Sequence, residues 1–118
     1  DIYCIILNET EAESFGYSNF LHDVKEEYPE LRVVLTLGKD GSIYQYKDEY
    51  IKQDAFKVNT VDTTAAGDTF TGYLISKSAK GDMAAAMNYA SAAAGITASR
   101  NGAATSIPDL EEVEKFIK

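Results

Sequence analysis

The spacing of apolar residues predicts extended segments in the first half of the chain. Continuous apolar runs at 2–7 and 31–37 are typical of strands that are covered on both faces of a sheet. Alternating runs at 42–46 and 49–53 predict a β-hairpin, and the run at 56–61 predicts a further short strand. We therefore expect a mixed, mainly parallel sheet with an antiparallel hairpin at one edge.

Apolar residues recur at helical intervals in the remaining segments. These helices are expected at 9–15, 18–28, 66–79, 83–99 and 109–117. Pro29 ends the second helix, and Asp82 stands where the N-cap of the fourth would lie. Helices that alternate with strands indicate the α/β fold class, in which helices flank a sheet.

Length and composition narrow the class of protein. A chain of 118 residues suits one domain of ordinary size. Its 11 basic and 19 acidic residues give a net charge of -8, which argues against a nucleic-acid or anionic-membrane surface. The apolar stretch 83–98 is interrupted by Asn88 and Ser91 and is too short to span a bilayer, so it predicts a buried helix.

Two single residues carry little chemistry by themselves. Cys4 is the sole cysteine of the sequence, which excludes an intramolecular disulfide and fits a reducing, cytoplasmic location. His22 is the sole histidine and stands among charged residues. Because no second His or Cys is nearby, we interpret it as a solvated surface residue and not as a catalyst or ligand.

The stretch 61–70 is the strongest candidate for a chemical site. Small residues in this turn leave the backbone N–H groups of Ala66, Gly67 and Asp68 open at the start of a predicted helix. Such donors, with the positive end of the helix dipole, suit a phosphate. A carboxylate repels a resting phosphate. Asp68 is therefore better suited to accept a proton from a hydroxyl group that attacks the phosphate. A purely structural explanation also fits, in which Asp68 favours the helix dipole and Gly67 permits the turn.

The whole string 62–68, DTTAAGD, resembles the C-terminal signature of the ribokinase (PfkB) family of carbohydrate kinases. The resemblance implies a Rossmann-like ribokinase fold and an ATP-dependent sugar kinase with Asp68 as general base. It places Ala65, Ala66 and Gly67 in the catalytic turn, with the amides of Ala66 and Gly67 as the anion hole.

A second string supports the same family. Asn8-Glu9-Thr10-Glu11 follows the first strand and is similar to the family's NxxE motif. The resemblance assigns Asn8 and Glu11 to the phosphate and magnesium network, with Glu11 acting through water because Mg²⁺ dehydrates reluctantly. The alternative is that Asn8 caps the following helix and the acidic residues favour its N-terminus.

A glycine-bearing turn follows the second predicted strand. The segment 36–41, TLGKDG, resembles the family segment that lies along ATP, and implies nucleotide contacts from Thr36, Gly38, Lys39, Asp40 and Gly41. It is not a GxxxxGK[ST] loop, so Lys39 is not assigned the phosphate-binding role that the lysine has there. An exposed turn residue is the alternative for Lys39.

The alanine-rich helix 83–99 is suited to close packing against a sheet or a ligand. Close packing explains most of its positions. Asn88 and Ser91 are the two candidates to face the adenine, and the resemblance places Ser91 where relatives contact the base.

The segment 99–108, SRNGAATSIP, is similar to the family's TRxGAxxSxP element. In relatives that depend on a monovalent cation, this loop and the DTT turn enclose potassium through oxygen atoms that are mostly backbone carbonyls. The implied K⁺ ligands are Asp62, Thr64, Thr97, Arg100, Gly102 and Ser106, with Arg100 contributing its carbonyl. The alternative is that Arg100 pairs with a nearby acid and Gly102 forms a turn.

The resemblance covers nearly all of the chain but only the C-terminal part of a complete kinase. Together with the abrupt apolar start at 2–7, it leads us to expect a piece of a longer protein whose sugar-binding half and lid lie upstream. The implied ligands are ATP, Mg²⁺, K⁺ in cation-dependent members, and a small sugar, in a complete protein that is a homodimer. Two rivals stay open: a nucleotide-binding module that is inactive by itself, and a non-enzymatic interaction domain. An open sheet edge would also favour self-association.

Overall fold

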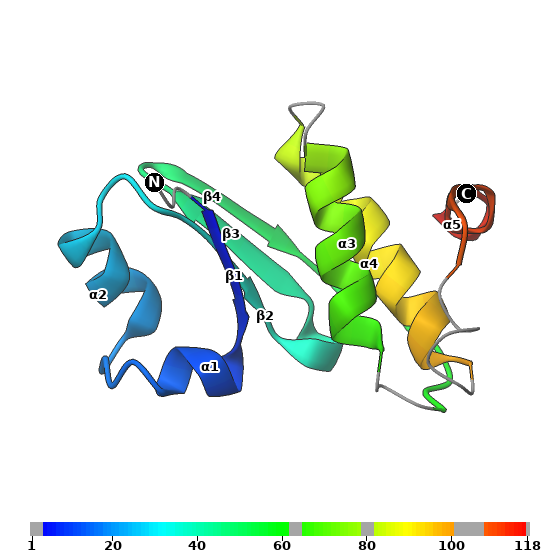
Figure 1. Ribbon diagram of the computed structural model, residues 1–118, viewed down its shortest axis with the longest axis horizontal. Helices are drawn as coiled ribbons and strands as arrows, with labels where there is room; N and C mark the ends of the chain where they lie inside the picture. The colour runs from blue at the N-terminus through cyan, green and yellow to red at the C-terminus, as the bar shows by residue number, and fades with distance from the viewer. Residues whose placement is uncertain (1–3, 62–64, 79–81, 101–107, 118) are drawn as a thin grey trace. The chain divides into compact units, whose positions relative to one another are not determined.

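The computed structural model describes residues 4–61, 65–78, 82–100 and 108–117 (Figure 1). These residues form two compact units, Asp1–Lys52 and Gln53–Lys118. The first contains most of a four-stranded sheet and two α-helices, and the second contains three α-helices among its described residues. No described helix is long and apolar enough to cross a membrane.

The sheet of the first unit has the strand order β1-β2-β3-β4. β1 (Cys4–Asn8) pairs in parallel with β2 (Arg32–Thr36), and β2 pairs antiparallel with β3 (Ser42–Tyr46). β4 (Glu49–Gln53) follows β3 after the predicted two-residue turn and lies at the edge. The mixed sheet with an edge hairpin is therefore confirmed. The described strands are not mainly parallel as expected, because β1 and β2 are parallel whereas β2 and β3 are antiparallel.

Two helices cover one face of this sheet. α1 (Glu9–Glu13) and α2 (Phe20–Glu27) contribute Ala12 and Val24 to a core that they share with residues of β1 and β2. That core consists of Leu7, Ala12, Val24, Val33 and Leu35. A short 3₁₀ helix, η1 (Gly38–Asp40), follows β2.

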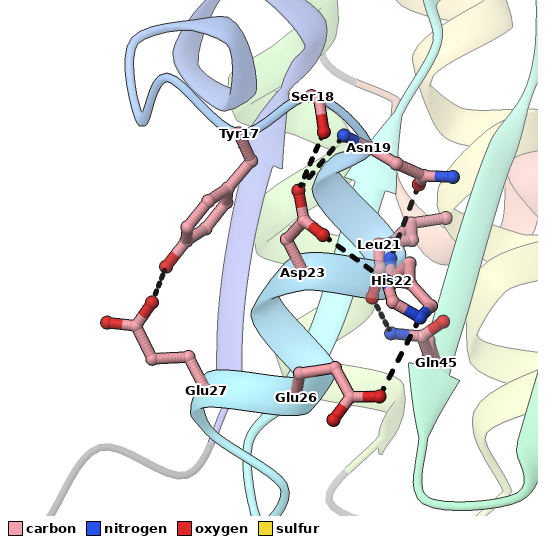
Figure 2. A network of polar contacts seen from close by, with 9 residues as sticks. All are labelled: Tyr17, Ser18, Asn19, Leu21, His22, Asp23, Glu26, Glu27 and Gln45. Atoms are coloured by element: carbon pink, nitrogen blue, oxygen red, sulfur yellow. Dashed lines mark hydrogen bonds and ion pairs between the residues drawn. The ribbon is translucent and has the colours of Figure 1, made fainter.

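Polar contacts fix α2 at its two ends (Figure 2). At the N-terminus the Asn19 side chain caps the helix, and the Asp23 carboxylate accepts from the Asn19 amide at 3.1 Å. Near the C-terminus the Tyr17 hydroxyl donates to Glu27 at 2.7 Å, which raises the pKa of Tyr17 to about 12. His22 is exposed and contacts Asp23 and Glu26 only at the surface, as the sequence indicated.

The second unit is built from α3 (Ala66–Ser78), α4 (Met83–Ala98) and α5 (Leu110–Ile117). α3 and α4 lie side by side in Figure 1, and their inner residues Leu74 and Met87 are almost fully buried. Alanine allows this close approach, and the alanines of α4 also pack against Val113 of α5. Asp82 caps α4 as predicted, since its side chain accepts from the Ala85 amide at 3.1 Å.

The predicted strand at 56–61 is wrong. These residues have no strand assignment and no ladder partner among the described strands. Their alternating burial instead reflects packing on helices: Phe56 contacts the Phe116 ring, and Val58 lies beside Gly95 of α4. An extended apolar segment needs a neighbouring strand to become part of a sheet, and here helices occupy that place.

Candidate functional site

The ends of β1 and β2 bring two of the predicted segments together in the first unit. Asn8 and Thr36 are paired residues at the carboxyl ends of these parallel strands. The Thr36 hydroxyl also donates to the Leu7 carbonyl at 3.4 Å. The NxxE segment and the TLGKDG turn therefore leave the sheet at the same edge, where ligands of α/β sheets bind.

Asn8 and Glu11 form a capping box at the start of α1. The Asn8 side chain accepts from the Glu11 amide at 2.8 Å, and the Glu11 carboxylate accepts from the Asn8 amide at 2.9 Å. The predicted capping role of Asn8 is thus confirmed. Both residues are exposed, and their assignment to phosphate and magnesium stays a prediction.

The TLGKDG turn has a backbone that needs glycine. Gly38 has a φ of 58° and Gly41 a φ of 101°, and residues with a side chain rarely adopt such values. Lys39 and Asp40 are exposed, and Lys52 of β4 donates to the Asp40 carbonyl at 2.8 Å. The hydroxyl of Ser42, next to the turn, is buried without a partner in the described chain, which leaves it open to an ordered water.

The start of α3 carries the predicted catalytic turn in the second unit. Ala65 is buried and Ala66 half-buried, whereas Gly67 and Asp68 are exposed. The Thr69 amide donates to the Ala65 carbonyl at 3.0 Å, a helical hydrogen bond of the first turn. A Cβ added at Gly67 would meet no described atom of another segment within 4 Å, in keeping with its exposure.

Two contacts hold this helix start against the C-terminal end of α4. The Val61 amide donates to the Ala98 carbonyl at 2.7 Å. The Thr97 hydroxyl donates to the Thr69 hydroxyl at 3.1 Å, and both side chains are buried. Thr69 had no predicted role; the signal that could have marked it is its place beside Phe70 on the buried side of a helix.

Two further contacts tie α5 to its neighbours. Arg100, which follows α4, donates to the Glu112 carboxylate, so the predicted pairing of Arg100 with an acid is confirmed. The Tyr73 hydroxyl of α3 donates to the Pro108 carbonyl at 2.6 Å. Burial raises the pKa of Tyr73, and the charges of Asp109 and Glu112 raise it further. Residues on both sides of 101–107 are thus anchored to helices.

The other predicted site residues divide into two groups. On α4, Ser91 is buried and Asn88 is half-buried, and their contact with adenine stays a prediction. Four proposed cation ligands, Asp62, Thr64, Gly102 and Ser106, lie outside the described residues. Among the residues that are described, no group of three or more His, Cys, Asp and Glu side chains is arranged for a metal ion.

The arrangement of α3 suits chemistry on an anion. Backbone amides at a helix N-terminus attract negative charge, and the exposed Asp68 carboxylate stands beside them on α3. The use of these groups in catalysis stays a prediction.

Known proteins resemble this chain in sequence and in fold. Residues 1–110 match the family described as pfkB family carbohydrate kinase. The chain is 42% identical to the ribokinase of Staphylococcus aureus (strain COL), over 94% of this chain and 40% of that protein.

Solved structures show the same fold. The ribokinase of Arabidopsis thaliana complexed with ribose and ATP has a TM-score of 0.90 and 29% identity, and covers 99% of this chain and 41% of that one. A putative ribokinase II from E. coli in complex with ATP and Mg²⁺ has a TM-score of 0.88 and 27% identity, over 97% and 38% of the two chains. The chain thus spans about two fifths of the length of these relatives, with their ribokinase fold.

Sequence motifs, fold and relatives lead to one conclusion. The chain belongs to the pfkB family of carbohydrate kinases.

Proposed function

We propose that this chain is the C-terminal, nucleotide-binding and catalytic part of an ATP-dependent kinase that phosphorylates a primary hydroxyl of a sugar. One observation carries the proposal. Within a chain of this family, the exposed Asp68 stands beside the amides of Ala66 and Gly67 at the N-terminus of α3.

Asp68 acts as the general base. It takes the proton of the sugar hydroxyl as that oxygen attacks the γ-phosphorus of ATP, and the bond to the β-phosphate oxygen breaks to release ADP. The amides of Ala66 and Gly67 stabilise the charge on the transferred group, with Ala65 as the buried residue that starts the turn. Preorganised donors of this kind each contribute about 3–4 kcal/mol to the transition state.

ATP lies along the edge where β1 and β2 end. Thr36, Gly38, Lys39, Asp40 and Gly41 line the nucleotide, and Asn8 faces its phosphates. The positive φ values at Gly38 and Gly41 support this role, because they bring a backbone without side chains close to a ligand. Asn88 and Ser91 of α4 contact the base.

Glu11 holds Mg²⁺ through water. One carboxylate oxygen caps α1 and the other has no partner among the described residues, so it is available to a metal-bound water. When bound, Mg²⁺ neutralises phosphate charge. This fits the E. coli relative, which is described in complex with ATP and Mg²⁺.

A monovalent cation, K⁺, shapes the anion site from behind. Two of its ligands, the carbonyls of Thr97 and Arg100, come from the last turn of α4 and from the second residue beyond it. The negative end of this helix dipole favours a cation, and the Val61–Ala98 hydrogen bond brings the chain next to Asp62 to the same place. Asp62, Thr64, Gly102 and Ser106 supply the remaining oxygens.

The sugar is ribose or a close relative. The ribokinases of S. aureus and A. thaliana support this class, and the latter is described with ribose bound. The complete enzyme is a cytoplasmic homodimer that acts on small molecules and not on nucleic acid or membranes, in keeping with the net charge of -8.

A second candidate follows from the share of the relatives that the chain spans. With about two fifths of their length, these 118 residues by themselves form a nucleotide-binding module without turnover. Calorimetry of these 118 residues with Mg-ATP tests this second candidate. Heat of binding without ADP formation supports a nucleotide-binding module, whereas the absence of any heat of binding favours a non-enzymatic interaction domain.

The variant Asp68→Asn tests the proposed base in the full-length protein. We expect turnover to fall by about 10²–10⁴-fold, while binding of Mg-ATP, measured by calorimetry, changes little. Asn keeps the size and polarity of the side chain but does not accept the proton. Turnover at the wild-type rate would remove the base assignment.

A further inference from the structure

The hydroxyls of Thr69 and Thr97 form a buried polar contact between α3 and α4. Its two oxygens are 3.1 Å apart, and the residues are 3% and 1% exposed. Phe70 and Ile96, their neighbours along the chain, are apolar and also buried. Inside such a layer a hydroxyl pair adds a directional contact, because each oxygen has to stay within hydrogen-bond distance of the other.

Thr69 is placed directly after the three residues of the proposed anion hole and base. Its amide donates to the Ala65 carbonyl at 3.0 Å, and its side chain reaches α4 through Thr97. The turn that contains Ala66 to Asp68 is therefore closed by its own helical hydrogen bond and is linked to α4 at Thr69. A rotation of this turn would break the Thr69–Thr97 contact.

We propose that Thr69 and Thr97 are positioning residues: their hydroxyl pair fixes the first turn of α3 on α4 and thereby orients Asp68 and the amides of Ala66 and Gly67. This rests on the proposed kinase function. The side chain of Thr97 has this role independently of its carbonyl, which is the group assigned to the cation. Misplacement of reacting groups by about 1 Å can lower a rate by about 10²-fold, so a small contact can have a large effect.

Valine separates the hydrogen bond from packing, because it has nearly the shape of threonine. In Thr69→Val the hydroxyl of Thr97 is left without its partner, which destabilises the fold as well as the site. In the double variant Thr69→Val/Thr97→Val both hydroxyls are absent, and apolar groups of the same shape replace them at little cost in stability. Thr69→Ser is the matched control, since it retains the hydroxyl and loses only a methyl group.

The experiment uses the full-length kinase and measures kcat, the KM for ATP, the thermal midpoint, and amide hydrogen exchange of the first turn of α3. For the double variant we expect a thermal midpoint close to that of the wild type, a kcat lower by about 10–100-fold, a KM for ATP within about twofold, and faster exchange confined to this turn. Thr69→Ser should retain most of kcat despite its lost methyl group.

The outcomes separate the two proposals. A double variant with wild-type kcat and exchange, in an enzyme that Asp68→Asn inactivates, would overturn the positioning role and leave the proposed function intact. A kcat that decreases in proportion to the thermal midpoint across all three variants would also overturn the positioning role, because a loss of packing alone would explain the lower kcat. A wild-type enzyme without sugar phosphorylation would remove the proposed function, and this inference with it.

Discussion

The guanidinium group of Arg100 donates to the Glu112 carboxylate and so joins the end of α4 to the first turn of α5. Glu112 has a second role at the same place, since its other carboxylate oxygen accepts from the Asp109 amide at 3.3 Å. One side chain therefore closes the capping box of α5 and pairs with Arg100.

This pair predicts a dependence of stability on pH. The hydrogen bond from Arg100 lowers the pKa of Glu112 below its ordinary value of 4.5. A carboxyl whose pKa is lower in the folded state contributes stability above the unfolded pKa, and this contribution disappears as the pH falls through the folded pKa. The thermal midpoint of the wild type should exceed that of Glu112→Gln between about pH 5 and 7. The two midpoints should converge as the pH falls below about 4.

Gln is the matched replacement because it also forms a capping box, so the comparison isolates the ion pair. Thermal unfolding at several pH values, followed by circular dichroism, measures the contribution of this ion pair to stability. Parallel curves for the wild type and Glu112→Gln at every pH would contradict a stabilising ion pair.

Glu11→Gln separates the structural role of Glu11 from its proposed metal role. Gln at this position still accepts from the Asn8 amide, so α1 should keep its cap and the thermal midpoint should stay within about 2 °C. The loss of the carboxylate should raise the Mg²⁺ concentration for half-maximal activity of the full-length enzyme by about tenfold, since its charge favours the cation. An unchanged Mg²⁺ requirement would limit Glu11 to capping.

Gly67→Ala tests whether a ligand approaches the first turn of α3. The added Cβ would meet no protein atom within 4 Å, and alanine favours helices, so stability should stay equal or increase. A substrate phosphate close to the amide would meet this methyl group, and kcat/KM for ATP should fall by at least about tenfold. Steady-state kinetics and thermal unfolding measure the two effects.

Gly72→Ala is the control on the same helix. Gly72 is exposed, and a Cβ there would likewise meet no atom within 4 Å. It should increase helix stability by about 0.5–1 kcal/mol and leave the kinetics unchanged. Equal kinetics for both alanine variants would show that no ligand comes near Gly67.

Leu74 and Ile75 are neighbours on α3 with opposite environments, at 1% and 59% exposure. Leu74→Ala removes a fully buried side chain between α3 and α4 and should lower the free energy of unfolding by about 2–5 kcal/mol. Ile75→Ala should change it by no more than about 0.5 kcal/mol. Urea unfolding compares the two, and equal losses would argue against the burial of Leu74 in the helix pair.

Local sequence patterns were sufficient for most secondary structure. The β-branched run at 31–37 correctly predicted β2, and the alanine-rich run at 83–99 correctly predicted α4. Each pattern is compatible with only one backbone geometry that buries its apolar residues on one face. The strand expected at 56–61 is not formed because of the tertiary packing of this segment. Whether an extended segment joins a sheet depends on its neighbours, and here Phe56 and Val58 contact helices.

The sequence by itself determined which residues are the candidates for chemistry: a carboxylate at Asp68 after small residues, and glycines in the TLGKDG turn. Those assignments depend on residue type and local spacing, which can be read directly from the sequence. Only the tertiary structure decided the contacts between helices, such as Thr69 with Thr97 and Tyr73 with Pro108. Their members are 28 and 35 positions apart, and no local pattern encodes which distant hydroxyl or carbonyl will be within reach once the helices pack.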